Sequence, residues 1–198
     1  MQTRWGDRRA RRDDISRAGR SLLGEQGLAA LQMREVARRA GIALGTVYTY
    51  FPTKESLYAA MYAERLDEML GELAPALSEP ADLERLFVLV ATHYRDVYAE
   101  FGKELNVFAV ARSGSDATVN DELAAAAGRM WDAMRAIVQD VSAADPDLAL
   151  TMLWSTMTGL ADHFAGARHE MHPYSWDDAV WFAARTLTRG LAHEEQLR

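Results

Sequence analysis

The chain has 198 residues, 49% of them hydrophobic, so it can bury a sizeable core, and a disordered or fibrous protein is excluded. It contains no cysteine, which rules out disulfides, thiolate metal sites and cysteine nucleophiles. The net charge is −7, yet residues 1–56 carry eleven basic against six acidic side chains, and the rest is strongly acidic. A basic first part suits DNA, although a short charge run is as often a solvated face.

No run of residues approaches the roughly 18 consecutive apolar side chains of a membrane helix. The first residues are rich in arginine and lack the apolar segment of a secretion signal. We therefore expect a cytoplasmic protein with no membrane partner.

Helical periodicity of apolar residues runs through almost the whole chain, and no stretch alternates as a β-strand does. The sequence therefore predicts an all-α fold of about nine helices. The first of them ends near Gly27 and the second near Gly41, because glycine readily closes a helix. The third spans residues 44–50, since Pro52 keeps Phe51 out of the helical region.

A fourth helix is expected to begin after Thr53, whose hydroxyl can accept a backbone N–H, and to run towards Pro75. Residues 78–80 form the only proline-rich break of the first half, and we interpret them as the hinge between a head and a body. Two later helix starts are marked by strong signals. They are Asp145 before Pro146, and the capping box of Ser175 with Asp178.

Further helices of the body follow apolar stripes. A shorter one is expected near residues 107–110, ending at Ser113-Gly114-Ser115. The longer ones are expected near residues 83–101, 123–141, 147–168 and 176–193.

Residues 32–51 meet the steric requirements of a helix-turn-helix. Ala37 is small enough for the next helix to cross above it, and Gly41 makes the turn between the two helices. Three apolar side chains can fill the space beneath: Val36, Ile42 and Val47.

The residues that follow complete a longer pattern, through Tyr48, Tyr50, Phe51 and Lys54. With them, the segment strongly resembles the head of the TetR family of bacterial helix-turn-helix repressors (TetR/AcrR type). The resemblance covers about residues 9–69 and implies a DNA-binding domain there, followed by a ligand-binding and dimerisation domain over residues 78–198.

Two positions depart from the family pattern. Gln32 and Ala43 stand where Thr or Ser usually caps the second and third helices. A missing cap costs about 1 kcal/mol, which packing can absorb, but the phosphate contact of a hydroxyl is lost as well.

The resemblance implies that the third helix faces the major groove with Leu44, Gly45, Thr46, Tyr48 and Thr49. None of these side chains offers the bidentate contact of arginine with guanine, so weak base readout is expected. Phosphate contacts are expected from Arg34, Tyr48, Tyr50 and Lys54, with core packing as the alternative for the tyrosines. The arginines of residues 4–12 are expected either to touch DNA as an arm or to remain solvated.

The body is rich in aromatic and methionine side chains on predicted inner faces. Such walls suit an apolar or aromatic effector, although such stripes are more often ordinary core. His93 and His163, beside these stripes, can orient a ligand by a hydrogen bond, or can find their hydrogen-bond partners within the core. The candidate pocket residues are Phe87, His93, Tyr94, Phe108, Met130, Trp131, Met134, Trp154, Met157 and His163.

Small residues recur on the last two predicted helices. In the family this helix pair meets its twin across a two-fold axis, which implies a homodimer reading near-palindromic double-stranded DNA. The candidate interface residues are Thr156, Gly159, Trp176, Ala183 and Ala184.

We therefore expect a dimeric, sequence-specific transcriptional regulator, a repressor released by a small apolar or aromatic effector. The main alternative is an effector-free or partner-regulated DNA-binding protein with a solid core, and a helical enzyme is a distant third. No cofactor and no metal are expected. The cluster at residues 169–172 lacks the His-Glu-x-x-His spacing and reads as a loop, and no phosphate-binding loop occurs.

Overall fold

The computed structural model describes residues 4–78, 82–102, 117–141, 145–165, 167–171 and 173–193. These residues form eight α-helices and two short 3-10 helices, with no strand among them. The all-α prediction is confirmed. The short helix expected near residues 107–110, and with it the ninth helix of the prediction, lies outside the described residues.

The chain divides into two compact units. Unit 1 comprises Met1–Arg65 and Lys103–Ala126, and unit 2 comprises Leu66–Gly102 and Ala127–Arg198. Helices α4 and α7 contribute residues to both. The units are discontinuous in sequence, whereas the expected domains, 9–69 and 78–198, are linear segments, so those boundaries stay a prediction.

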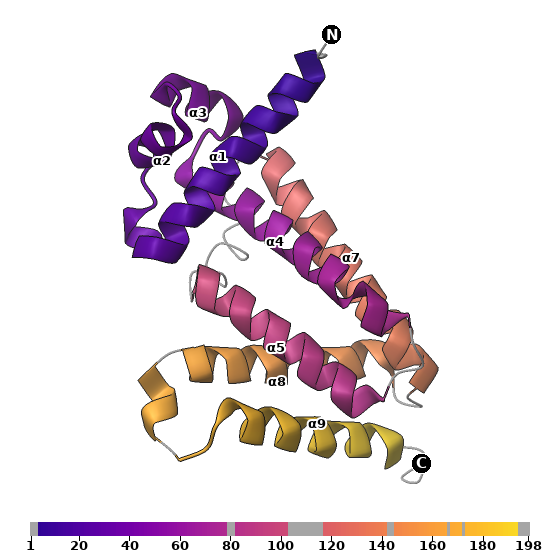
Figure 1. The fold of residues 1–198 in the computed structure, drawn as a ribbon. Helices are drawn as coiled ribbons and strands as arrows, with labels where there is room; N and C mark the ends of the chain where they lie inside the picture. Colours follow the sequence, from indigo (N-terminus) through magenta and orange to yellow (C-terminus); the bar gives the residue numbers. More distant parts are fainter. Residues whose placement is uncertain are drawn as a thin grey trace. The chain divides into compact units, whose positions relative to one another are not determined.

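Unit 1 is built on a long first helix, α1 (Arg4–Gln26), followed by η1 (Leu28–Ala30), α2 (Met33–Ala40), α3 (Leu44–Tyr50) and the first part of α4 (Lys54–Leu77). Helix α1 packs on α2, and α2 packs on α3 (Figure 1). The buried side chains of this unit are mostly apolar, among them Ile15, Leu22, Val36, Val47, Phe51 and Leu57.

The amino-terminal arginines belong to this first helix. Residues 4–12, expected as an arm or a solvated segment, are the first turns of α1. Helix α4 likewise extends further than its sequence signal, passing through Pro75 to Leu77.

Three predicted helix starts are confirmed by their hydrogen bonds. At α4 the Ser56 amide donates to the Thr53 hydroxyl at 3.0 Å, and the Thr53 amide donates to the Ser56 hydroxyl at 3.1 Å. At α8 (Pro146–Ala165) the Asp145 carboxylate accepts from two backbone amides, at 2.9 and 3.0 Å. At α9 (Trp176–His193) Ser175 and Asp178 form the expected reciprocal pair.

Unit 2 contains α5 (Leu83–Phe101), the later part of α7 (Ala117–Val141), α8, η2 (Ala167–Met171) and α9. Helix α5 packs on both α8 and α9, which lie side by side (Figure 1). The cluster at residues 169–172, expected as a loop, falls in η2 as far as Met171, and His172 lies outside the described residues. Within the described ranges, no helix combines the length and apolarity needed to cross a bilayer.

Candidate nucleic-acid interface and ligand cavity

Helices α2 and α3 form the predicted helix-turn-helix. Gly41 adopts the left-handed conformation (φ 65°, ψ 33°), which glycine reaches without steric cost, and turns the chain between the helices. The Ile42 amide then donates to the Ala37 carbonyl at 3.0 Å. Val36 and Val47 are fully buried between the helices and Ala37 is 3% exposed, so small and branched apolar side chains fix the crossing.

Helix α3 presents one side to solvent. Val47 is buried beneath it, whereas Gly45, Tyr48 and Thr49 are exposed, with Tyr48 at 46%. Leu44, Thr46 and Tyr50 are half-buried. The exposed side is therefore the side that the sequence assigned to DNA, although contact with DNA remains a prediction.

The two departures from the family pattern have the expected structural result. Neither Gln32 before α2 nor Ala43 before α3 makes a side-chain capping hydrogen bond. The Thr49 hydroxyl donates to the Gly45 carbonyl one turn earlier at 2.9 Å, which leaves its oxygen available as an acceptor.

The basic side chains of α2 divide into paired and unpaired ones. The Arg38 Nε donates to Glu35 at 2.8 Å, and Arg39 binds Glu25 of α1 through two N–H groups at 2.6 and 2.8 Å. These hydrogen bonds from arginine lower the pKa of both carboxyls. Arg34 is exposed and has no ion pair within the described part of the chain, so its charge is available to a phosphate.

Lys54 has a structural contact that the sequence did not reveal. Its Nζ donates to the carbonyl of Leu28 at 3.0 Å and so ties the start of α4 to η1. An ammonium group has three N–H donors, so two are left for a phosphate beside this bond. The expected phosphate role of Lys54 is therefore still a prediction.

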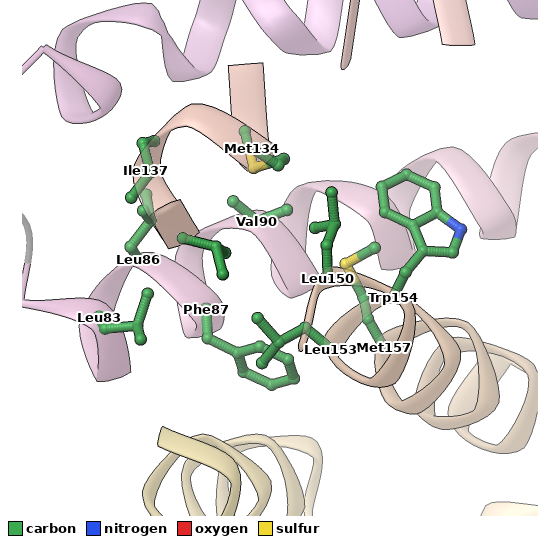
Figure 2. A pocket seen from close by; sticks show the side chains of 11 residues that line it. Leu83, Leu86, Phe87, Val90, Met134, Ile137, Leu150, Leu153, Trp154 and Met157 are labelled. Carbon is green, nitrogen blue, oxygen red and sulfur yellow. The ribbon is translucent and has the colours of Figure 1, made fainter. Parts of the chain in front are cut away.

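Unit 2 contains a cavity between α5, α7 and α8 (Figure 2). About 420 Å³ of it is free of atoms, part of this space being open to solvent, and no charged side chain lines it. Four of the predicted pocket residues are among the lining: Phe87, Met134, Trp154 and Met157. The sequence missed seven more, Leu83, Leu86, Val90, Ile137, Val138, Leu150 and Leu153, because aliphatic stripes look the same in a core and in a pocket wall.

Three other predicted pocket residues act in the surrounding packing. Tyr94 is buried against Trp154, with ring centres 5.3 Å apart, and Met130 is fully buried. The His93 Nδ1 lies 2.9 Å from the Leu89 carbonyl of its own helix, so this ring nitrogen has a hydrogen-bond partner within the chain. None of the three is among the residues that line this cavity, so their part in ligand binding stays a prediction.

The remaining pocket candidates lie elsewhere. Arg135 and Trp131 hydrogen-bond to Asp147 at the start of α8, and the arginine above all lowers the pKa of that carboxyl. His163 lines a groove along α8 and α9, and Phe108 lies outside the described residues.

Large apolar side chains are exposed along α8 and α9. Leu148 and Met152 are 58% and 51% exposed on α8, and Phe182 is 67% exposed on α9. The predicted interface residues Thr156 and Ala183 are half-exposed, and Gly159 is exposed. An interface at these residues stays a prediction, and the large exposed side chains were not among its candidates.

Two interface candidates point into the chain itself. Ala184 is fully buried, so it offers no surface to another protomer. The Trp176 indole donates to Thr92 of α5 at 3.3 Å, and the Arg95 guanidinium lies 4.8 Å from its ring centre. Trp176 thus takes part in the contact of α9 with α5.

A buried polar pair joins α5 to α8. The hydroxyl of Tyr98, 4% exposed, donates to Asp162 at 2.5 Å, and Asp162 also pairs with Arg168 of η2 at 2.9 Å. Burial, followed by the bond to the carboxylate, raises the pKa of Tyr98.

The helix-turn-helix, its exposed recognition side and the unpaired arginine beside it define the class: a helix-turn-helix DNA-binding protein of all-α fold. A family profile described as bacterial regulatory proteins, tetR family, matches residues 15–61. Residues 15–61 therefore form a head of the tetR family type.

Curated relatives are similar over part of the chain. The fatty acid metabolism regulator protein of Bacillus subtilis is 27% identical over 74 residues, 37% of this chain and 38% of that protein. The repressor KstR of Rhodococcus jostii is 45% identical over 60 residues, 29% of this chain and 28% of that one. The matched segments thus span well under half of these relatives.

Solved structures resemble the whole fold. The regulator FadR of Bacillus subtilis, solved with stearoyl-CoA, has a TM-score of 0.62 at 18% identity, covering 91% of this chain and 97% of that one. A protein of unknown function from Rhodococcus has a TM-score of 0.71 at 22% identity, covering 92% and 95%. At these identities the likeness concerns the fold alone.

Proposed function

We propose that the chain is a dimeric, sequence-specific transcriptional repressor of the cytoplasm that a small apolar molecule releases from DNA. The observation that carries the proposal is the pairing of two features in one chain. One is the α2–α3 helix-turn-helix with the unpaired Arg34 beside it, and the other is the uncharged cavity of unit 2.

The proposed DNA surface is the exposed side of α3 with the cations around it. Leu44, Gly45, Thr46, Tyr48 and Thr49 would meet the bases, and Arg34, Tyr50 and Lys54 the phosphates. Because no arginine lies on α3, phosphate contacts should supply most of the affinity, and the pairing of two heads should supply much of the selectivity.

The experiment is to select duplexes bound by the protein from a random pool and to measure affinity against salt concentration. Affinity should fall linearly on a log–log scale, and Arg34→Ala should reduce the slope by about one. Arg85→Ala, which removes an exposed arginine from α5, is the matched control and should leave the slope unchanged. A protein that enriches no duplex, or whose binding ignores salt, contradicts the proposal.

Lys54 needs a second measurement because it has a structural bond. Lys54→Gln should lower the free energy of unfolding by about 1 kcal/mol, the net worth of a hydrogen bond. If Lys54 also binds phosphate, the salt slope falls together with the stability. A loss of stability with an unchanged slope assigns Lys54 to the fold alone.

An apolar chain or ring is the proposed effector class. Apart from the indole nitrogen of Trp154, the labelled side chains that line the cavity show only carbon and sulfur (Figure 2). The similar fold of FadR was solved with stearoyl-CoA, which supports acyl chains as the first probes.

Melting temperature in the presence of fatty acids and acyl-CoA thioesters of increasing length tests this class. A specific ligand at a hundred times its Kd adds about 2.7 kcal/mol to stability. Leu153→Trp, which fills the cavity, should abolish the shift and serves as the control. If none of these probes or of a wider apolar set raises the melting temperature, the effector-free regulator is favoured instead.

The exposed sides of α8 and α9 are the proposed dimer surface, because α8 exposes Leu148 and Met152 and α9 exposes Phe182. Sedimentation analysis should give a dimer that Phe182→Glu dissociates. Met171→Glu, at an 82% exposed apolar residue of η2, should leave the dimer intact. A monomeric parent chain contradicts this part of the proposal.

A further inference from the structure

Arg12 of α1 lies where three other elements of unit 1 meet. Its Nη2 donates to Glu122 of α7 at 2.5 Å, and its Nη1 lies 3.8 Å from Glu64 of α4. Its Cζ lies 5.2 Å from the ring centre of Phe51, the residue that ends the recognition helix α3. A single guanidinium therefore contacts two carboxylates and one aromatic ring.

These contacts separate Arg12 from the other arginines of the same segment. Arg8, Arg9 and Arg11 are exposed and make no ion pair within the described residues, so their charges are open to solvent or DNA. Arg12 is 28% exposed and its charge is used internally. Its planar guanidinium suits this place, because it can stack on a ring while its N–H groups bind carboxylates.

The two carboxylates that contact the guanidinium differ in burial and in their other hydrogen bonds. Glu64 is half-buried and also accepts a hydrogen bond from the buried Ser16 of α1 at 3.0 Å. The Glu122 side chain is 42% exposed, and its hydrogen bond reaches α1 from a segment 110 residues away. The contact with Glu122 is therefore the easier one to lose.

Helix α7 gives this contact a particular place in the fold. It runs without a break from Ala117 to Val141. Glu122 lies near its start, and Met134, Ile137 and Val138, further along the same helix, line the cavity. At the other end of the contact, Arg12 lies over the ring of Phe51, the residue that ends the recognition helix α3.

We propose that Arg12 is a positioning residue for the recognition helix, and that its ion pair with Glu122 couples α7 to the end of α3. Loss of the pair frees the guanidinium from Phe51 and loosens the last turn of α3. The effect on DNA binding rests on the proposed function, whereas the effect on the order of α3 does not.

The test compares Glu122→Gln with Asp121→Asn, which removes an exposed charge one residue earlier on α7 that has no ion pair in the described chain. Amide hydrogen exchange of the free protein is measured in α3 and at Phe51, whose amide donates to Val47 at 2.9 Å. Glu122→Gln should accelerate exchange there by about two- to fivefold, the range of a partly exposed ion pair. Asp121→Asn should not.

Arg12→Lys supplies a second comparison, because it keeps the charge and loses the planar group. It should accelerate exchange at Phe51 as well, and adding Glu122→Gln to Arg12→Gln should change nothing further. Equal exchange in Glu122→Gln and Asp121→Asn overturns the proposal. So does an equal acceleration throughout α1 and α2, which would mean a general loss of stability.

Binding to the selected duplex completes the test. Glu122→Gln should weaken it by about the same factor as it accelerates exchange, since a less ordered α3 costs binding energy. If the parent protein binds no duplex, the proposed function fails, and the exchange comparison still decides the role of Arg12.

Discussion

Units 1 and 2 are both helical and both contain polar contacts between helices, but they differ around their proposed sites. In unit 1, directed polar contacts fix the junctions between helices: Arg39 binds Glu25 across α2 and α1, and Lys54 binds the Leu28 carbonyl. In unit 2, the walls of the cavity are apolar, and they include two flexible methionines, Met134 and Met157.

The difference follows from the tasks proposed for the two units. Reading DNA requires a few side chains at fixed separations, and directed hydrogen bonds fix geometry. Accepting an apolar ligand requires walls that adjust, and contacts of methionine and aliphatic side chains are not directional. If this comparison is right, unit 1 depends on fixed geometry more strongly than unit 2 does.

The largest effect is expected at Phe51, which is fully buried at the end of α3. Phe51→Ala should lower the free energy of unfolding by about 3–5 kcal/mol, because it removes a buried ring and leaves a cavity. DNA binding should be lost with it. Urea denaturation followed by circular dichroism measures the stability.

Tyr48→Ala is the matched control, since it truncates an aromatic side chain that is 46% exposed on the same helix. Its stability should stay within about 0.5 kcal/mol of the parent, while DNA binding weakens. A large loss of stability in Tyr48→Ala would place this side chain in the core and count against its expected DNA contact.

The local features of the head were predictable from sequence. The bounds of α3, residues 44–50, follow from Gly41 and Pro52, and the starts of α4, α8 and α9 follow from their capping residues. Each of these signals acts between residues close together in the chain. Backbone sterics and nearby hydrogen bonds decide them almost alone.

The cavity and the position of Arg12 were not predictable in this way. An apolar stripe shows which side of a helix is buried, but not whether its neighbours leave a void, so Tyr94 and Leu153 could not be told apart. Arg12 looked like part of a basic arm because its partner Glu122 is 110 residues away. Ala184 looked suited to a dimer interface, yet it is consumed by packing within the chain.

A smaller effect is expected in unit 2 at its buried polar pair. Tyr98→Phe removes the hydrogen bond to Asp162 and should cost about 1–2 kcal/mol at pH 7, since that acceptor carboxylate is 26% exposed. Tyr48→Phe, at an exposed tyrosine, should cost nothing measurable.

The cost should also depend on pH. The folded chain raises the pKa of Tyr98, so the stabilisation is complete below about pH 10, the ordinary value of tyrosine, and is lost as the pH rises above it. The parent should therefore approach Tyr98→Phe in stability at high pH. A difference that stays constant from pH 7 to about 11 contradicts this account.

The smallest effect is expected at Glu64, where the directed contacts of unit 1 include an unfavourable one. Burial, opposed by the Ser16 hydrogen bond and the charge of Arg12, raises the pKa of the Glu64 carboxyl above its ordinary value of 4.5. Stability from this group is complete below that value and is lost as the pH rises through the folded pKa.

Glu64→Gln keeps an acceptor for the Ser16 hydroxyl and removes the buried charge. The variant should be slightly more stable than the parent at pH 7, and this advantage should shrink as the pH falls below about 4.5. Urea denaturation at several pH values measures it, with Asp121→Asn as the control for loss of an exposed carboxylate. A variant less stable than the parent at pH 7 would show that the ion pair with Arg12 outweighs the burial of Glu64, and that directed contacts stabilise unit 1 throughout.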